Sequence, residues 1–288
     1  FFTLAFLSTS LVSLSQEKAD QTWKQKFEQL GTMLPTPNTY RTASGAPGHE
    51  YWQQRADHKM QVVLNDANQT LSGKETITYY NQSPDVLTYL WLQLDQNQQA
   101  KDSDTPLTQS STMRDTLSSR ALLSYVDDYE GGFKIASVKD AAGKPMRYTI
   151  NKTMMRIDLA QPLKKGESVV FNIEWSYNIN NRMLNGGRSG LEYFEDQNEY
   201  LYTIAQFFPR MAPYMDNEGW QNKQFLGAGE FALNFGNYEV EITVPSDFVV
   251  GATGWLQNQE EVLTKNELAR FKAAQKSFDK PVIIVTQE

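Results

Sequence analysis

The sequence has no cysteine and two histidines, His49 and His58, among its 288 residues. Without cysteine the chain can form neither a disulfide nor a thiolate nucleophile. Zinc sites in proteins take three or four ligands, most often from histidine and cysteine, so this chain has too few for an ordinary zinc site. Catalysis by a serine and a histidine stays open only through one of the two histidines.

Basic residues are also scarce, because 27 lysines and arginines stand against 34 aspartates and glutamates, a net charge of −7. Proteins that bind nucleic acid neutralise its phosphates with Lys and Arg, so we expect no nucleic-acid partner. No apolar run reaches the roughly 20 residues that span a bilayer, so we expect no membrane span. An apolar share of 40% and an aromatic share of 12% are typical of an ordinary globular protein.

Residues 1–15 form a short, uncharged apolar stretch, and Ser13 and Ser15 supply the small residues of a cleavage site. We interpret this stretch as part of a signal peptide, with a buried N-terminal strand or helix as the alternative. No initiator Met and no basic segment precede it, so we expect the sequence to begin inside the signal. The protein is then secreted, periplasmic or held in the cell envelope.

Residues 16–50 are predicted to form a leader in front of the folded body. Apolar residues at spacings of three and four predict a short amphipathic helix here: Ala19, Trp23, Phe27 and Leu30. A linker rich in Pro and Gly follows and ends near Gly48.

From residue 51 onward, apolar and polar side chains alternate, as in strands that bury one face. The predicted strands are 60–64, 71–80, 86–94, 133–138, 146–150, 154–159, 169–177, 200–208, 238–244 and 248–253. Turn signals about every ten residues favour a mainly β, antiparallel sandwich-like domain. We also predict one or two surface helices, at 110–123 and at 264–275, the second with a capping box at Thr264. The β-branched run 281–288 indicates one more strand, so we expect the domain 51–288 to be truncated at its C-terminal end.

The peptide His49-Glu50-Tyr51-Trp52-Gln53 begins like the H-E-x-x-H zinc helix. Gln53 stands where the second histidine is required, and an amide is a poor zinc ligand. We therefore predict no metal site here and interpret His49 as a solvated side chain before the first strand. No catalytic residue is assigned elsewhere in the chain.

Aromatic residues end the predicted strand 200–208, and a polar stretch follows it. A strand end carrying Phe207 and Phe208 beside a polar loop is a common place for a ligand pocket. The spacing alone favours core positions for the two rings. The alternatives, pocket wall and core, stay open at this point.

Five segments together carry a resemblance to a known family: Tyr51-Trp-x-x-Arg-Ala-Asp57, Thr203-Ile-Ala-Gln-Phe-Phe-Pro-Arg210, Glu230-Phe231, Tyr238-Glu-Val-Glu-Ile-Thr-Val-Pro245 and Gly251-Ala-Thr-Gly254. They resemble the N-terminal domain of zinc aminopeptidases related to aminopeptidase N and leukotriene hydrolase. More narrowly, the chain is similar to secreted members from Bacteroidetes-type bacteria. The resemblance runs from about residue 51 to the end and is most specific between residues 206 and 254.

The resemblance implies a saddle-shaped β domain that packs on a separate catalytic domain. That domain would carry the zinc ligands, and its H-E-x-x-H motif is absent from this sequence. The chain is thus expected to be the substrate-cleft domain of a zinc metallopeptidase, with a peptide substrate and its own C-terminal catalytic domain as partners. The alternative is a stand-alone secreted β-sandwich that binds protein or glycan without catalysis.

The family's N-terminal domain contributes a Gln-x-Glu/Gln segment, whose second polar residue grips the free amino group of the substrate. Gln206 matches its first position, and Phe208 stands at the second, where a carboxamide or carboxylate is expected. A phenyl ring can offer the amine only a cation–π face. Gln206, Phe207 and Phe208 are therefore the candidate substrate-binding residues.

Overall fold

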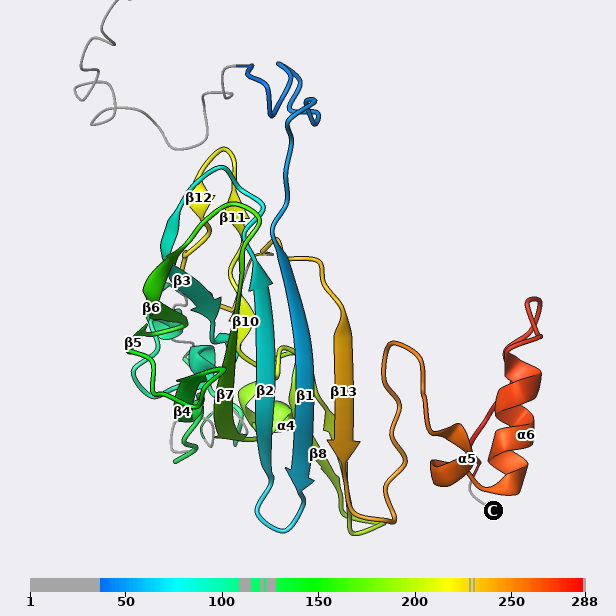
Figure 1. Ribbon diagram of the computed structural model, residues 1–288. Coiled ribbons are helices and arrows are strands. Elements are labelled where there is room, and N and C mark those ends of the chain that lie inside the picture. Colours follow the sequence, from blue (N-terminus) through cyan, green and yellow to red (C-terminus); the bar gives the residue numbers. More distant parts are fainter. Residues whose placement is uncertain are drawn as a thin grey trace, which may run out of the picture. The chain divides into compact units, whose positions relative to one another are not determined.

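A computed structural model describes residues 37–108, 115–119, 122, 128–227, 229 and 231–286 (Figure 1). The signal peptide 1–15, the leader helix and most of the surface helix 110–123 lie outside these residues, so they remain predictions. The chain divides into two compact units, Phe1–Val244 and Pro245–Glu288. Among the described helices, none combines the length and apolarity needed to cross a membrane.

Unit 1 contains the sheets, and the prediction of a mainly β, sandwich-like fold is confirmed. The larger sheet, with long strands side by side in Figure 1, has the order β13 (Tyr238–Thr243), β1 (Arg55–Asn65), β2 (Thr70–Tyr80), β7 (Ser168–Asn178) and β4 (Lys134–Asp140). The smaller sheet has the order β10 (Arg210–Met211), β3 (Leu87–Gln93), β6 (Met154–Leu163) and β5 (Tyr148–Asn151). Two hairpins pair β8 (Gly190–Phe194) with β9 (Glu199–Thr203) and β11 (Tyr214–Met215) with β12 (Gly219–Trp220).

The alternation in sequence decides which face of the larger sheet is buried. In β1 every second side chain from Ala56 to Leu64 is buried, and the residues between them are exposed or partly exposed. The same parity holds in β2 and β7, where Ile77, Phe171 and Ile173 have no exposed surface. The core thus lies on one face of this sheet, and the other face meets water.

One pairing departs from the antiparallel pattern. Strand β13 lies parallel to β1, with His58 opposite Tyr238 and Val62 opposite Ile242. Gly236 precedes β13 and permits this approach, because a Cβ there would lie 1.7 Å from the backbone oxygen of Ala56. The last strand of unit 1 therefore pairs with the first.

Short helices complete unit 1: the 3-10 helix η1 (Asp95–Gln99), α2 (Thr105–Thr108) and α4 (Arg182–Asn185). Unit 2 contains α5 (Gln259–Val262) and α6 (Lys265–Ala274). The predicted capping box is confirmed, since Thr264 accepts from the Glu267 N–H and the Glu267 carboxylate accepts from the Thr264 N–H.

Three strand predictions were wrong in whole or in part. The strand predicted at 200–208 is β9, which ends at Thr203. Residues 248–253 and 281–286 form no strand. Their β-branched residues fit a strand, but a strand also needs a hydrogen-bonded neighbour, and no described segment pairs with them.

Candidate functional site

The predicted substrate-binding residues lie in the segment Ala205–Arg210, which comprises most of the loop after β9 and the first residue of β10. We call it the aromatic loop. Gln206 has φ of +52°, in the left-handed region that non-glycine residues adopt infrequently. A strand cannot continue through that conformation, which explains why β9 ends before the two phenylalanines. Gln206, Phe207 and Phe208 are all partly exposed.

Helix η1 holds the aromatic loop at both of its ends. The Gln96 side-chain amide donates to the backbone oxygens of Ala205 and Gln206, at 3.1 and 3.0 Å. At the other end, Asp95 forms an ion pair with Arg210. Arg210 also donates to the Gln93 side-chain oxygen at 3.3 Å. Of these two adjacent buried residues, Gln96 thus fixes the loop backbone and Asp95 holds the Arg210 side chain.

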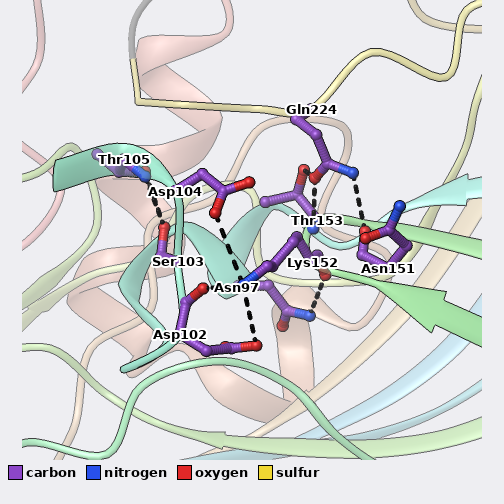
Figure 2. Close-up of polar contacts among 9 residues, drawn as sticks. All are labelled: Asn97, Asp102, Ser103, Asp104, Thr105, Asn151, Lys152, Thr153 and Gln224. Carbon is purple, nitrogen blue, oxygen red and sulfur yellow. Dashed lines mark hydrogen bonds and ion pairs between the residues drawn. The ribbon is translucent and has the colours of Figure 1, made fainter. Parts of the chain in front are cut away.

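Helix η1 is in turn anchored by a polar cluster at the β5–β6 turn (Figure 2). Asn97 donates to the Lys152 backbone oxygen and accepts from the Phe133 N–H, both at 2.7 Å. The Gln224 side chain holds the same turn through Thr153 and Asn151. The Lys152 ammonium lies between the carboxylates of Asp102 and Asp104, at 3.4 and 3.6 Å. Helix η1, which supports the aromatic loop, is therefore held by Phe133 and by the β5–β6 turn. Gln224, Asp102 and Asp104 in turn hold that β-turn segment.

The two rings of the loop pack on the inner face of the larger sheet. Phe207 lies 6.4 Å from the Trp175 ring and 5.0 Å from Phe208. Phe208 lies edge-on to His58 at 5.5 Å and to Tyr238 at 6.1 Å. Each ring covers core residues with one side and stays partly exposed. The contacts therefore agree with core positions, and the pocket wall stays a prediction.

Beneath Phe208 lies a buried acid and base pair. His58 stacks on Tyr238 at 5.0 Å, and its Nδ1 is 3.9 Å from the Glu75 carboxylate, beyond hydrogen-bond distance. Among the described residues, neither Glu75 oxygen nor His58 Nδ1 has a hydrogen-bond partner. Burial lowers the pKa of His58 to about 4, with a small opposing effect of Asp57, and raises the pKa of Glu75 well above its usual value. His58 is therefore neutral near pH 6, and burial favours the neutral form of the Glu75 carboxyl.

His58 and Glu75 make opposite contributions to the pH dependence of stability. His58 binds a proton in the unfolded chain below pH 6.5 but in the folded chain only below about 4, so its contribution is lost as pH falls through that window. Glu75 binds its proton more tightly when folded, so its contribution is present below pH 4.5 and lost as pH rises through its raised pKa. In the wild-type protein the two contributions partly cancel, so the pH dependence of its stability reports only their difference.

Single substitutions separate the two contributions. We expect Glu75→Gln to leave the His58 effect, so that the free energy of unfolding rises by about 3 kcal/mol from pH 4 to pH 6.5. We expect His58→Phe to leave the Glu75 effect, so that the free energy of unfolding falls as pH rises. Urea unfolding across this pH range measures both. The exposed His49→Gln and Glu174→Gln serve as controls, and identical slopes in all four variants would contradict the assignment.

The described residues do not fit a zinc ion. They contain no group of three or more His, Cys, Asp or Glu side chains that could hold a metal. His49 is exposed, whereas His58 is buried against Glu75. The two histidines therefore do not act together as ligands of one metal ion.

A hollow of about 90 Å³ lies elsewhere in unit 1, lined by Trp52, Tyr214, Phe235 and the Arg41–Asp216 ion pair, among others. Trp52 and Tyr214 stack at 5.8 Å. None of the three predicted site residues lines it. Its volume suits a single side chain rather than a whole ligand, since ligand pockets hold about 300 Å³ or more.

The structure brings the predicted residues together with others that the sequence reasoning missed. Asp95 and Gln96 fell in a polar stretch that carried no motif. Glu75 and His58 could have been found, because each stands at an inward, otherwise apolar position of its strand. The available signal was a polar residue at a strand position where the alternation predicts a buried side chain.

Comparisons with known proteins give a limited result. No family model and no curated protein matches the chain. A solved M1 zinc metallopeptidase from Deinococcus radiodurans is similar over 74% of this chain and 37% of its own, with 12% identity and a TM-score of 0.38. A mutant of an M1 zinc metallopeptidase from the same organism, bound to a Tyr-Ser-Ala substrate, gives 13% identity, 74% and 38% coverage and the same TM-score.

The chain thus spans well under half of the length of these solved structures. The similarity is to part of an M1 zinc metallopeptidase. Similarity at this TM-score shows no shared function, so the function is inferred from the residues of this chain.

Proposed function

We propose that this chain forms one wall of the substrate cleft of a zinc-dependent aminopeptidase. The proposal is carried by the aromatic loop, where two partly exposed phenylalanines stand on a backbone fixed by Gln96 and by the Asp95–Arg210 pair. A rigid loop with exposed aromatic rings binds a ligand without losing much conformational entropy. The five sequence segments that resemble the aminopeptidase N-terminal domain support the same assignment.

In this proposal the chain binds and orients the peptide and leaves bond cleavage to a separate domain. The zinc ligands belong to that domain, because the two histidines here are unsuited to the task. Zinc, when bound there, supplies the Lewis acid that polarises the scissile carbonyl. Residues 1–15 favour export of the whole protein, as a part of the proposal that rests on sequence alone.

Phe208 is proposed to lie beside the free amino group of the substrate. A ring face attracts an ammonium by roughly 0.5–2 kcal/mol, depending on how far the pair is desolvated. A carboxylate at the same position would form an ion pair with the amine and bind it more strongly. The identity of residue 208 therefore controls affinity for substrates with a free amino terminus.

Substitution of Phe208 in the enzyme that contains this domain tests the proposal. We expect Phe208→Glu to lower KM for a free-amino peptide by about tenfold, the effect of one partly desolvated ion pair, and to leave N-acetylated peptides unaffected. Phe194→Glu is the matched control, because Phe194 is exposed on β8 away from the loop. An equal effect on both peptides, or no effect, would place the amine elsewhere.

The coding sequence after Glu288 separates this proposal from a stand-alone binding module. An H-E-x-x-H motif within the following few hundred codons is expected, and its absence would refute the peptidase assignment. Peptidase activity or stoichiometric zinc in the purified 288-residue chain would show instead that the catalytic residues lie within it.

A further inference from the structure

Strand β13 has one free edge. It is the first strand in the order of the larger sheet, so among the described residues it pairs only with β1. The backbone oxygens of Phe235 and Asn237 accept from Ala56 and His58 of β1. Alternate residues of a strand direct their backbone groups to opposite sides. The N–H and C=O groups of Tyr238, Val240 and Ile242 therefore point to the free edge.

The inner face of β13 is apolar, and the described residues cover it only in part, with Tyr238 packed on His58 and Phe208. Tyr238, Val240 and Ile242 are 50%, 39% and 43% exposed. Their partners on β1, by contrast, are buried, with Met60 at 1% and Val62 at 3%. The apolar face of the sheet thus extends one strand beyond the part that the core covers. A segment at this edge would have to present apolar side chains on the inner side.

The outer face of β13 is acidic. Glu239 pairs with Lys59 at 2.7 Å, and Glu241 accepts from the Gln61 amide at 2.9 Å. Both carboxylates stay in the outermost row of the sheet, where an added strand would lie against them. A second copy that extended the sheet with β13 would place these carboxylates beside their own counterparts, which is unfavourable. A basic row is the complement.

We infer that the free edge of β13 binds an extended protein segment in which apolar residues alternate with Lys or Arg. Its backbone would hydrogen-bond to Tyr238, Val240 and Ile242, as in other cases of strand addition. Its apolar side chains would cover the inner face. Its basic side chains would meet Glu239 and Glu241.

Two synthetic peptides test this inference on the intact chain: one alternates Val with Lys, and the other alternates Val with Glu. We expect the Lys peptide to slow amide hydrogen exchange at Val240 and Ile242 and to bind about tenfold more tightly than the Glu peptide, as two exposed charge pairs would allow. We also expect this preference to weaken at higher salt. Equal binding of both peptides, or protection at a different edge, would overturn the inference.

Two variants of β13 separate its backbone and charge contributions. Val240→Pro removes an N–H that points away from β1, so the ladder with β1 is kept and binding of the Lys peptide should be lost. Glu239→Gln with Glu241→Gln should keep binding but abolish the preference for Lys over Glu. Glu174→Gln, on the outer face of β7, is the matched control and should change neither.

Three further results would overturn the inference. The first is unchanged binding of the Lys peptide to a folded Val240→Pro variant. The second is a preference for the Lys peptide over the Glu peptide that survives in the variant carrying both Glu239→Gln and Glu241→Gln. That variant tests the contribution of charge even if Val240→Pro does not fold. The third is protection of Val240 that rises with protein concentration alone, because a second copy would then occupy the edge.

Discussion

Gly73→Val is expected to destabilise unit 1 by at least about 3 kcal/mol, the upper range for overpacking a core. A Cβ at residue 73 would lie 2.2 Å from the indole ring of Trp175, which crosses over this glycine from the neighbouring strand. Trp175 is 2% exposed and packs on Phe133 and Phe207, at 5.7 and 6.4 Å. These contacts limit how far the indole can move.

The matched control is Ser72→Val, one residue earlier on the exposed face of β2. A β-branched residue suits an exposed strand position, so this variant should be as stable as the wild type or slightly more stable. Urea unfolding followed by tryptophan fluorescence measures both variants. Equal stability of Gly73→Val and Ser72→Val would contradict the packing described for Trp175. Because Phe207 rests on Trp175, the glycine also supports the aromatic loop.

Arg210→Leu is expected to cost about 3–5 kcal/mol at neutral pH, because it leaves the buried Asp95 without a counter-ion. Asp95 has no exposed surface, and the Arg210 side chain is 14% exposed. Burial raises the pKa of Asp95, and Arg210 offsets part of this effect. Removal of Arg210 should therefore raise the pKa of Asp95 further.

The pH dependence of this loss has a definite sign. An acid whose pKa is raised on folding stabilises the protein below its unfolded pKa of 3.8, and the contribution is lost as pH rises through the folded pKa. The loss in Arg210→Leu should thus be smallest at acidic pH, where Asp95 is protonated in both proteins. Asp95→Asn combined with Arg210→Leu should recover part of the stability at neutral pH. A loss that is independent of pH would show that Asp95 is not the group left uncompensated.

Much of the larger sheet was predictable, because its strands bury one face. The alternation located β2 and β7 to within one residue of their observed ends, whereas β1 begins at Arg55, before the predicted strand 60–64. The parallel pairing of β1 with β13 was not predictable in this way. Alternation shows which side chains face inward, but it contains no information about which strands are neighbours.

The candidate site could be proposed from sequence only where the sequence carried a motif. Gln206, Phe207 and Phe208 were found from a segment that is unusual by itself. Asp95 and Gln96 bind a loop that lies more than a hundred residues later, with a separation of 110 between Gln96 and Gln206. Such contacts depend on the tertiary fold, and a polar residue before a loop is otherwise expected to be solvated.

The pairing of β1 with β13 also constrains how unit 1 folds. Lys59 and Glu239, which are joined across this pair, are separated by 180 residues along the chain. Contacts of such high sequence separation form slowly, because a long loop must close first. During synthesis on the ribosome, β1 can pair with β2 early but gains its second neighbour only after residue 243 has emerged. Until then its open edge can pair with other nascent chains, so this interval is where unit 1 is most prone to aggregate.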